Sequence, residues 1–235
     1  MRDYLEALFI ALIISWLITP WYRRAAEKLG LVDEPNARRL NRVPVPTGGG
    51  IVIMAAFWAA VWLSGARHQA VPGLLAGSLI IGITGLADDR LDLRARTKLM
   101  GQILAAAAVV ANGTVVQFVT NPFGGMIYLG WLGIPLTILW IVAVTNMFNF
   151  IDGLDGLAAG VAVIASVSLF GVAHELGYSF VALLLLALAG STLGFLRYNF
   201  NPASVFMGDT GAMFLGFMLS SLAVEGALKG AATVA

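Results

Sequence analysis

This sequence contains no cysteine, only two histidines and few charged residues. Of its 235 residues, 11% are charged and 59% are hydrophobic, and the mean hydropathy is +0.87. Soluble domains are roughly 25% charged, so the composition indicates an integral membrane protein. The lack of cysteine excludes disulfides and thiolate metal sites. A net charge of +1 gives no general argument for binding nucleic acid.

Long apolar runs fill most of the chain. A helix needs about 20 mainly apolar residues to cross a bilayer core of roughly 30 Å. This rule predicts an all-α, polytopic membrane protein with about eight transmembrane helices. We see no repeat and no linker, so we expect a single domain over residues 1–235. The predicted spans are 4–21, 48–64, 71–87, 98–112, 134–150, 157–173, 178–196 and 210–228.

The basic residues are divided unevenly between the two predicted sides. Eleven of the fourteen Lys and Arg residues fall on, or at the edge of, the first, third and seventh connections between spans. Lys and Arg accumulate on the cytoplasmic side of membrane proteins. The bias therefore predicts that both chain ends lie outside and that these connections are cytoplasmic. Five aspartates share that side: Asp88, Asp89, Asp152, Asp155 and Asp209.

The first polar stretch is GLADDRLDLRARTKLMGQ, residues 85–102. Adjacent carboxylates at the end of a span repel each other unless a cation lies near them. Mg²⁺ is such a cation, because it binds a few carboxylates together with substrate phosphates. The alternative is a solvated helix end with local Arg–Asp pairs.

The second stretch is NMFNFIDGLDGLAAG, residues 146–160. Its Asn and Asp residues recur every third position, whereas an α-helix turns every 3.6 residues, so they do not stay on one face. We expect the helix to break near Asp152 and a new helix to start near Leu157. Irregular polar backbone at membrane depth lines protein-enclosed cavities. The alternative, a simple polar turn, does not explain the amides of Asn146 and Asn149.

Two further stretches are polar. In RYNFNPASVFMGDTGAMFLG, residues 197–216, glycines allow a ligand to approach the backbone. Here Asp209 is either a ligand-binding residue or the N-cap of the last span, and Phe206 is either a binding residue or an interfacial hydrophobe. In LVDEPNARRLNRVPVPTGGG, residues 31–50, the arginines suit phosphate, but we favour a positively charged loop with a turn.

Together these stretches resemble the polyprenyl-phosphate N-acetylhexosamine-1-phosphate transferases of glycosyltransferase family 4. The resemblance runs from about Leu31 to Phe217 and is strongest in LADDRLDLRARTKL, NMFNFIDGLDGLAAG and NPASVFMGDTGAMFLGF. The short DDRLDL connection is similar to the undecaprenyl-phosphate N-acetylglucosamine-1-phosphate transferase branch rather than the phospho-N-acetylmuramoyl-pentapeptide branch.

The resemblance implies a reaction and its participants. A UDP-N-acetylhexosamine gives its sugar-1-phosphate, GlcNAc-1-phosphate in the closer branch, to a polyprenyl (undecaprenyl) phosphate, and UMP leaves. The product serves cell-wall or surface polysaccharide synthesis. The resemblance also implies a bacterial cytoplasmic membrane protein in contact with lipid, with its active site facing the cytoplasm, no nucleic-acid partner, and a homodimer as one option.

It also implies roles for individual residues. The cofactor would be Mg²⁺, with Mn²⁺ as an alternative, and the lipid phosphate would attack directly. The implied metal ligands are Asp209 and Asp88; the implied catalytic residues are Asp88, Asp89, Asp152 and Asp155; and the implied substrate-binding residues are Lys98, Asn146, Asn149, Asn199 and Phe206, with Phe206 stacking on uracil.

The sequence departs from the family pattern at three places. Asn41 stands where members usually carry histidine, and Ala212 replaces a usual serine. After Ala235 we expect the family's further spans and its cytoplasmic histidine loop to be lacking. Two other functions therefore stay open: an inactive homologue or fragment that binds nucleotide sugar or lipid phosphate, and a transporter with broken helices.

Overall fold

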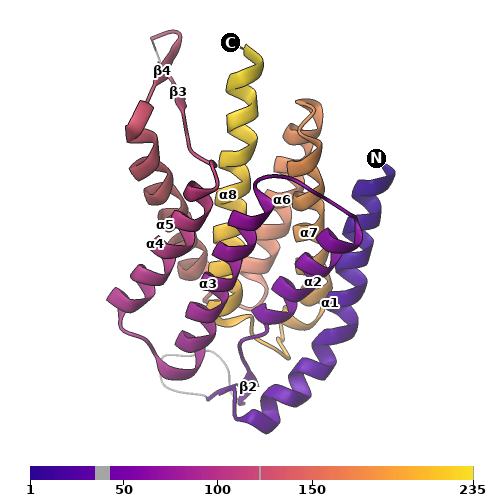
Figure 1. Ribbon diagram of the computed structural model, residues 1–235. Helices are drawn as coiled ribbons and strands as arrows, with labels where there is room; N and C mark the ends of the chain where they lie inside the picture. The colour runs from indigo at the N-terminus through magenta and orange to yellow at the C-terminus, as the bar shows by residue number, and fades with distance from the viewer. Residues whose placement is uncertain (35–42, 122, 235) are drawn as a thin grey trace.

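In the computed structural model the chain is a helical bundle (Figure 1), described for residues 1–34, 43–121 and 123–234. Asn41 lies outside the described residues. Within them, the helices are α1 (Arg2–Leu29), α2 (Gly50–Leu63), α3 (Val71–Leu91), α4 (Ala95–Ala111), α5 (Gly133–Ile151), α6 (Leu157–Glu175), α7 (Ser179–Asn199) and α8 (Gly208–Val234). Two antiparallel hairpins pair β1 (Val32–Asp33) with β2 (Val45–Pro46) and β3 (Phe118–Thr120) with β4 (Met126–Tyr128), and a 3₁₀ turn covers Gly130–Leu132.

Each of these helices coincides with one predicted span, so the prediction of an all-α, multi-pass membrane protein is confirmed. Among the described residues, six helices are long and apolar enough to cross a membrane. The other two are α2, with 14 residues, and α4, with 17. At 1.5 Å per residue α2 reaches about 21 Å, less than the roughly 30 Å of a bilayer core. The number of eight spans and their orientation therefore stay predictions.

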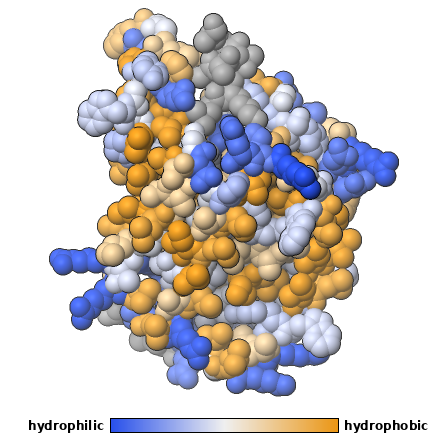
Figure 2. Space-filling view, in the orientation of Figure 1, coloured by the Kyte–Doolittle hydropathy of each residue, from blue (hydrophilic) through white to orange (hydrophobic). Residues whose placement is uncertain are grey.

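The helix α8 forms the centre of the bundle. It packs against α2, α3, α5 and α6, and 83% of its membrane-length window is buried, against 22% for α1. Figure 2 shows a broad hydrophobic band around the middle of the visible face and hydrophilic side chains toward its ends. This is the pattern of a bundle that faces lipid along its sides and water at its ends.

Small residues bring α8 unusually close to its neighbours at its N-terminal end. A side chain on Gly50 of α2 would collide with Gly211, and one on Gly85 of α3 would collide with Thr210. Glycine is the residue that allows transmembrane backbones to approach in this way. The start of α8 is thereby held between α2 and α3.

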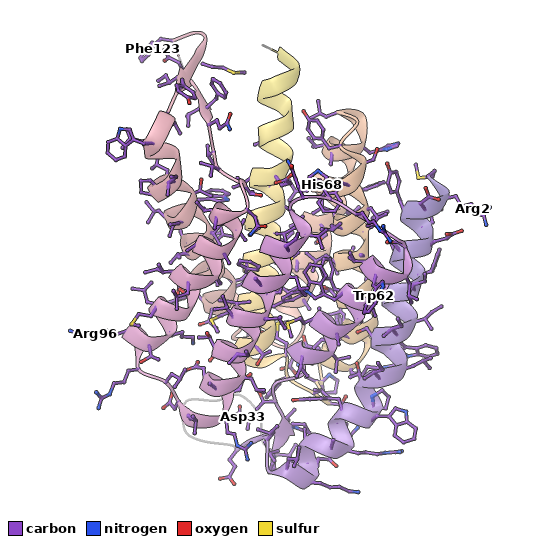
Figure 3. All side chains as sticks on the ribbon, viewed as in Figure 1. Arg2, Asp33, Trp62, His68, Arg96 and Phe123 are labelled. Carbon is purple, nitrogen blue, oxygen red and sulfur yellow. The ribbon has the colours of Figure 1, made fainter. Side chains whose placement is uncertain are left out.

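The two ends of the bundle differ in what they carry. The N-terminus of α1, the end of α8 and the β3–β4 hairpin lie at one end (Figure 1). The β1–β2 hairpin and the connections α3–α4, α5–α6 and α7–α8 lie at the other, which we call the site end. Figure 3 places Phe123 and Arg2 at the first end and Asp33 and Arg96 at the site end.

Candidate functional site

A cavity of about 640 Å³ opens at the site end. Its size falls in the range of small-molecule sites, and its wall is rich in carboxylates. Of the ten residues that the sequence singled out, eight line it. They are Asp88, Asp89, Asn149, Asp152, Asp155, Asn199, Phe206 and Asp209.

Lys98 joins three helices just behind this wall. Its Nζ lies 2.7 Å from Oδ2 of Asp88 on α3 and 3.1 Å from Oδ2 of Asp209 on α8. It also donates a hydrogen bond to Oδ1 of Asn149 on α5, at 3.3 Å. Asn149 in turn donates from Nδ2 to Asp209. One partly buried ammonium group therefore faces two carboxylates that would otherwise repel each other.

Asp89 is engaged differently from its neighbour Asp88. Its carboxylate accepts hydrogen bonds from the backbone N–H groups of Asp209 and Thr210, at 2.7 and 3.1 Å, and from the hydroxyl of Thr210, at 2.6 Å. Asp88 instead accepts from the N–H of Leu93 at 2.8 Å and pairs with Lys98. The two adjacent carboxylates thus interact with different groups.

The predicted break in the fifth helix is confirmed. The helix α5 ends at Ile151, and α6 begins at Leu157 after Gly156, which has a φ of 73° that glycine adopts without strain. The break leaves Asp152 at the cavity wall. Burial, and then the nearby carboxylates of Asp209 and Asp89, raise the pKa of Asp152 to about 8.

The α7–α8 connection forms a neighbouring part of the wall. Asp155 holds it, because its Oδ2 accepts hydrogen bonds from Nδ2 of Asn201, at 3.1 Å, and from the N–H of Ala203, at 2.9 Å. The backbone of Phe206 is tied to the stretch before α2: its N–H donates to the carbonyl of Pro46 and its carbonyl accepts from Gly49. These bonds fix the place of Phe206 in the cavity.

Asn199 presents an unsatisfied acceptor at this wall. It is 3% exposed, and its Nδ2 donates to the carbonyl of Val205 at 3.1 Å. Its Oδ1 is buried without a hydrogen-bond partner. Buried polar atoms are nearly always paired, so an unpaired acceptor beside a cavity suits a donor on a bound ligand.

Lys98 and Asn146 do not line the cavity. Asn146 forms a reciprocal amide pair with Gln102 of α4, with N···O distances of 3.1 and 2.6 Å, and it also donates to the carbonyl of Val142. Direct contact between Asn146 and a substrate therefore stays a prediction that this geometry does not support. Gln102 was not singled out from the sequence, although it stands in the first polar stretch.

The residues of the cavity fit a divalent cation bound together with phosphates. In the part of the chain that the structure describes, no three Asp, Glu or His side chains come together as a ready metal site. Mg²⁺ does not need one, since it binds one or two carboxylates plus substrate phosphates. Asp88 and Asp209 offer such a pair, and the ammonium of Lys98 between them shows that this place attracts positive charge.

Four further polar residues at the cavity wall were missed in the sequence: Asp33, Thr47, Arg90 and Asp92. Asp33 and Thr47 reach it through the β1–β2 hairpin, whose two-residue strands give no signal in the sequence. Arg90 and Asp92 lie within the first polar stretch, in which the adjacent carboxylates of Asp88 and Asp89 are the stronger signal.

Comparison with known proteins gives a consistent picture. The model of the family described as "Glycosyl transferase family 4" matches residues 71–227, well over half of the chain. A probable undecaprenyl-phosphate N-acetylglucosaminyl 1-phosphate transferase of Bacillus subtilis is 40% identical over 225 residues, covering 95% of this chain and 63% of the relative.

Two other relatives carry different names. A decaprenyl-phosphate N-acetylglucosaminephosphotransferase of Mycobacterium tuberculosis is 37% identical, over 92% of this chain and 59% of the relative. A phospho-N-acetylmuramoyl-pentapeptide-transferase of Desulforudis audaxviator is 34% identical, over 93% of this chain and 73% of the relative. The chain thus spans about 60% of the length of the first two of these relatives.

Proposed function

This chain belongs to glycosyl transferase family 4, and we propose that it transfers a sugar-1-phosphate from a UDP-amino sugar to a polyprenyl phosphate, with release of UMP. The observation that carries the proposal is the pair of Asp88 and Asp209 at the wall of a nucleotide-sized cavity, with Lys98 bridging them from behind, at one end of a membrane bundle. A lipid phosphate lies at such a depth when its tail is in the bilayer.

The reaction requires two anions to meet. An oxygen of the lipid phosphate attacks the phosphorus that carries the sugar, the bond from that phosphorus to the bridging oxygen breaks, and UMP leaves. A phosphate monoester has its second pKa near 6, so most of the lipid phosphate is already dianionic at neutral pH. Direct attack therefore needs little help from a base, and phosphoryl transfer depends mainly on positioning and charge neutralisation.

The residues of the cavity divide this work. Lys98 supplies fixed positive charge, and Asn149 orients Asp209 by a hydrogen bond. Phe206 offers an aromatic face for the uracil, and the unpaired Oδ1 of Asn199 accepts from a donor on the nucleotide. Asp88 and Asp209 would hold Mg²⁺, which would supply charge neutralisation for the diphosphate. Asp152 and Asp155 complete the acidic wall.

The donor sugar is proposed to be GlcNAc, because the Bacillus relative, at 40% identity, is named for it. A relative named for phospho-N-acetylmuramoyl-pentapeptide is 34% identical, so the sugar has to be tested directly. The proposed orientation places the site end in the cytoplasm, where UDP-sugars are made.

UMP release tests the proposal. Purified protein in detergent, with Mg²⁺, undecaprenyl phosphate and UDP-GlcNAc, is expected to release UMP, and EDTA is expected to stop it. Asp209→Asn should lower the rate by about 10²-fold or more. Asp3→Asn, the same change on an exposed residue at the other end of the bundle, should leave it unchanged. Folded protein that releases no UMP from any UDP-amino sugar would contradict the proposal and favour a binding protein.

A further inference from the structure

We propose that Asp89 positions the metal-site carboxylate Asp209 by capping the N-terminus of α8 from the neighbouring helix, and that Asp88, rather than Asp89, acts on the reacting groups. This inference rests on the proposed function for its chemical meaning, but its structural part can be tested without activity. It assigns different roles to two adjacent aspartates: Asp88 acts on the reacting groups, and Asp89 positions the helix that carries Asp209.

The geometry of an N-cap is complete at the start of α8. The first backbone N–H groups of a helix have no partner within the helix, and a carboxylate or hydroxyl oxygen normally accepts from the second or third of them. Gly208 is the first residue of α8, so Asp209 and Thr210 are the second and third. Asp89 accepts from both N–H groups, one at each of its oxygens, at 2.7 and 3.1 Å.

The hydroxyl of Thr210 adds a third donor to the same carboxylate, at 2.6 Å. Thr210 is 0% exposed, so it does not reach a substrate. Three donors take up three of the about four acceptor positions of the Asp89 carboxylate, whereas a group that takes a proton from a substrate needs a free lone pair directed at that substrate. The hydrogen bonds therefore favour a structural role.

The surrounding backbone is shaped to admit this carboxylate. Gly208 has a φ of 68°, and a side chain on it would collide with the carboxylate of Asp89. One turn before Asp89 on α3, a side chain on Gly85 would collide with Thr210. The two glycines let α3 approach the start of α8 closely enough for Asp89 to reach its N–H groups.

The position of Asp209 depends on this contact. Its backbone N–H is held by Asp89, and its side chain then meets Lys98 at 3.1 Å and Asn149. Because α8 is the central helix of the bundle, a shift of its first turn moves Asp209 relative to both partners. Supporting contacts of this kind typically change metal affinity by about 10–100-fold when they are removed.

Thermal unfolding of the purified protein in EDTA tests the cap without activity. Asp89→Asn places an NH₂ group against backbone donors, so it should lower the melting temperature by about 2–8 °C. Thr210→Val, which removes the hydroxyl, should lower it by about 2–4 °C, and Thr210→Ser should recover most of that loss. The double variant Asp89→Asn/Thr210→Val should lose less than the sum of the two, because both changes break one contact.

Kinetics then separate a positioning residue from a reacting one. Asp89→Asn and Thr210→Val should raise the Mg²⁺ concentration for half-maximal UMP release, by about 10-fold or more for Asp89→Asn, and should leave the shape of the pH–rate profile unchanged. A base would lose one limb of that profile. An Asp89→Asn protein that melts like the wild type and loses a limb would overturn the inference. If the wild type releases no UMP, the proposed function fails, while the melting temperatures still decide the role of Asp89.

Discussion

At the scale of single residues, the site is a balance of buried charges. Asp88 and Asp209 lie on different helices and share Lys98, while Asp89 is satisfied by the start of α8. No residue that the structure describes donates a hydrogen bond to Asp152, and burial, followed by the carboxylates of Asp209 and Asp89, raises its pKa to about 8. This environment favours the protonated form of Asp152, and a cation in the cavity would favour its charged form.

This charge balance predicts how stability depends on pH. The unfolded chain loses the proton of Asp152 near pH 3.8, but the folded protein keeps it to about pH 8. Between these values the folded state binds more protons than the unfolded state, so raising the pH lowers stability. In EDTA, the melting temperature should fall as pH rises from about 4 to 8. Asp152→Asn should reduce that fall and should melt higher than the wild type at pH 8. The increase should be about 2–4 °C for each kcal/mol gained in the free energy of unfolding.

The measurement is thermal unfolding in detergent at a series of pH values. Asp92→Asn, a matched change at an exposed position of the same cavity, serves as the control and should keep the wild-type pH dependence. If Asp152→Asn follows the wild-type curve at every pH, Asp152 is charged in the folded protein and the acidic wall is balanced by another group.

At the scale of elements, two polar rungs join α4 to α5. Lys98 contacts Asn149 at 3.3 Å, and one turn further into the membrane Gln102 pairs with Asn146. Residues four apart on one helix and three apart on the other lie on the same faces, so the rungs stack. The second rung sets the spacing of the two helices at the point where Lys98 meets the site.

Exchanging the two amides tests this second rung. Gln102 is 1% exposed, so Asn146→Leu leaves its amide only a weak contact from Nε2 to the sulfur of Met213 and should cost about 1–3 kcal/mol of stability. Gln102→Leu leaves Asn146 its hydrogen bond to the carbonyl of Val142 and should cost less. The double variant Gln102→Asn/Asn146→Gln restores an amide pair of the same total length and should melt higher than Asn146→Leu. A double variant no more stable than Asn146→Leu would show that the pair does not hold the helices.

The sequence predicts the elements better than their contacts. Apolar runs locate the helices, and the pattern of Asn146, Asn149, Asp152 and Asp155 locates the break between α5 and α6, because both signals are local. The cap that Asp89 provides joins residues about 120 positions apart, and no local pattern encodes it. For the same reason, the sequence did not indicate Thr47 and Asp33 as cavity residues. It also predicted that Asn146 would contact a substrate, whereas in the structure Asn146 pairs with Gln102.

At the scale of the whole molecule, the two ends of the bundle differ in what they carry. The cavity and the aspartates that line it lie at one end, while the β3–β4 hairpin with its exposed aromatic side chains lies at the other (Figure 3). The family was predicted correctly because its motifs are local runs, and the comparisons confirm it. Orientation in the membrane is a property of the whole chain, and it is predicted here from the bias of Lys and Arg alone.

The lack of cysteine makes this orientation directly testable, because every introduced cysteine is the only one in the chain. Phe123→Cys, in the hairpin connection and 97% exposed, and Arg96→Cys, at the exposed start of α4, probe the two ends. The test uses intact cells whose outer layers admit a maleimide that does not cross the cytoplasmic membrane. This maleimide should label Phe123→Cys at once, and should label Arg96→Cys only after the cytoplasmic membrane is permeabilised. Ile83→Cys, 68% exposed in the middle third of α3, should resist labelling in membranes because lipid covers it. Labelling of Arg96→Cys in intact cells would place the site end outside, where no cytosolic UDP-sugar could reach it, and would contradict the proposed orientation.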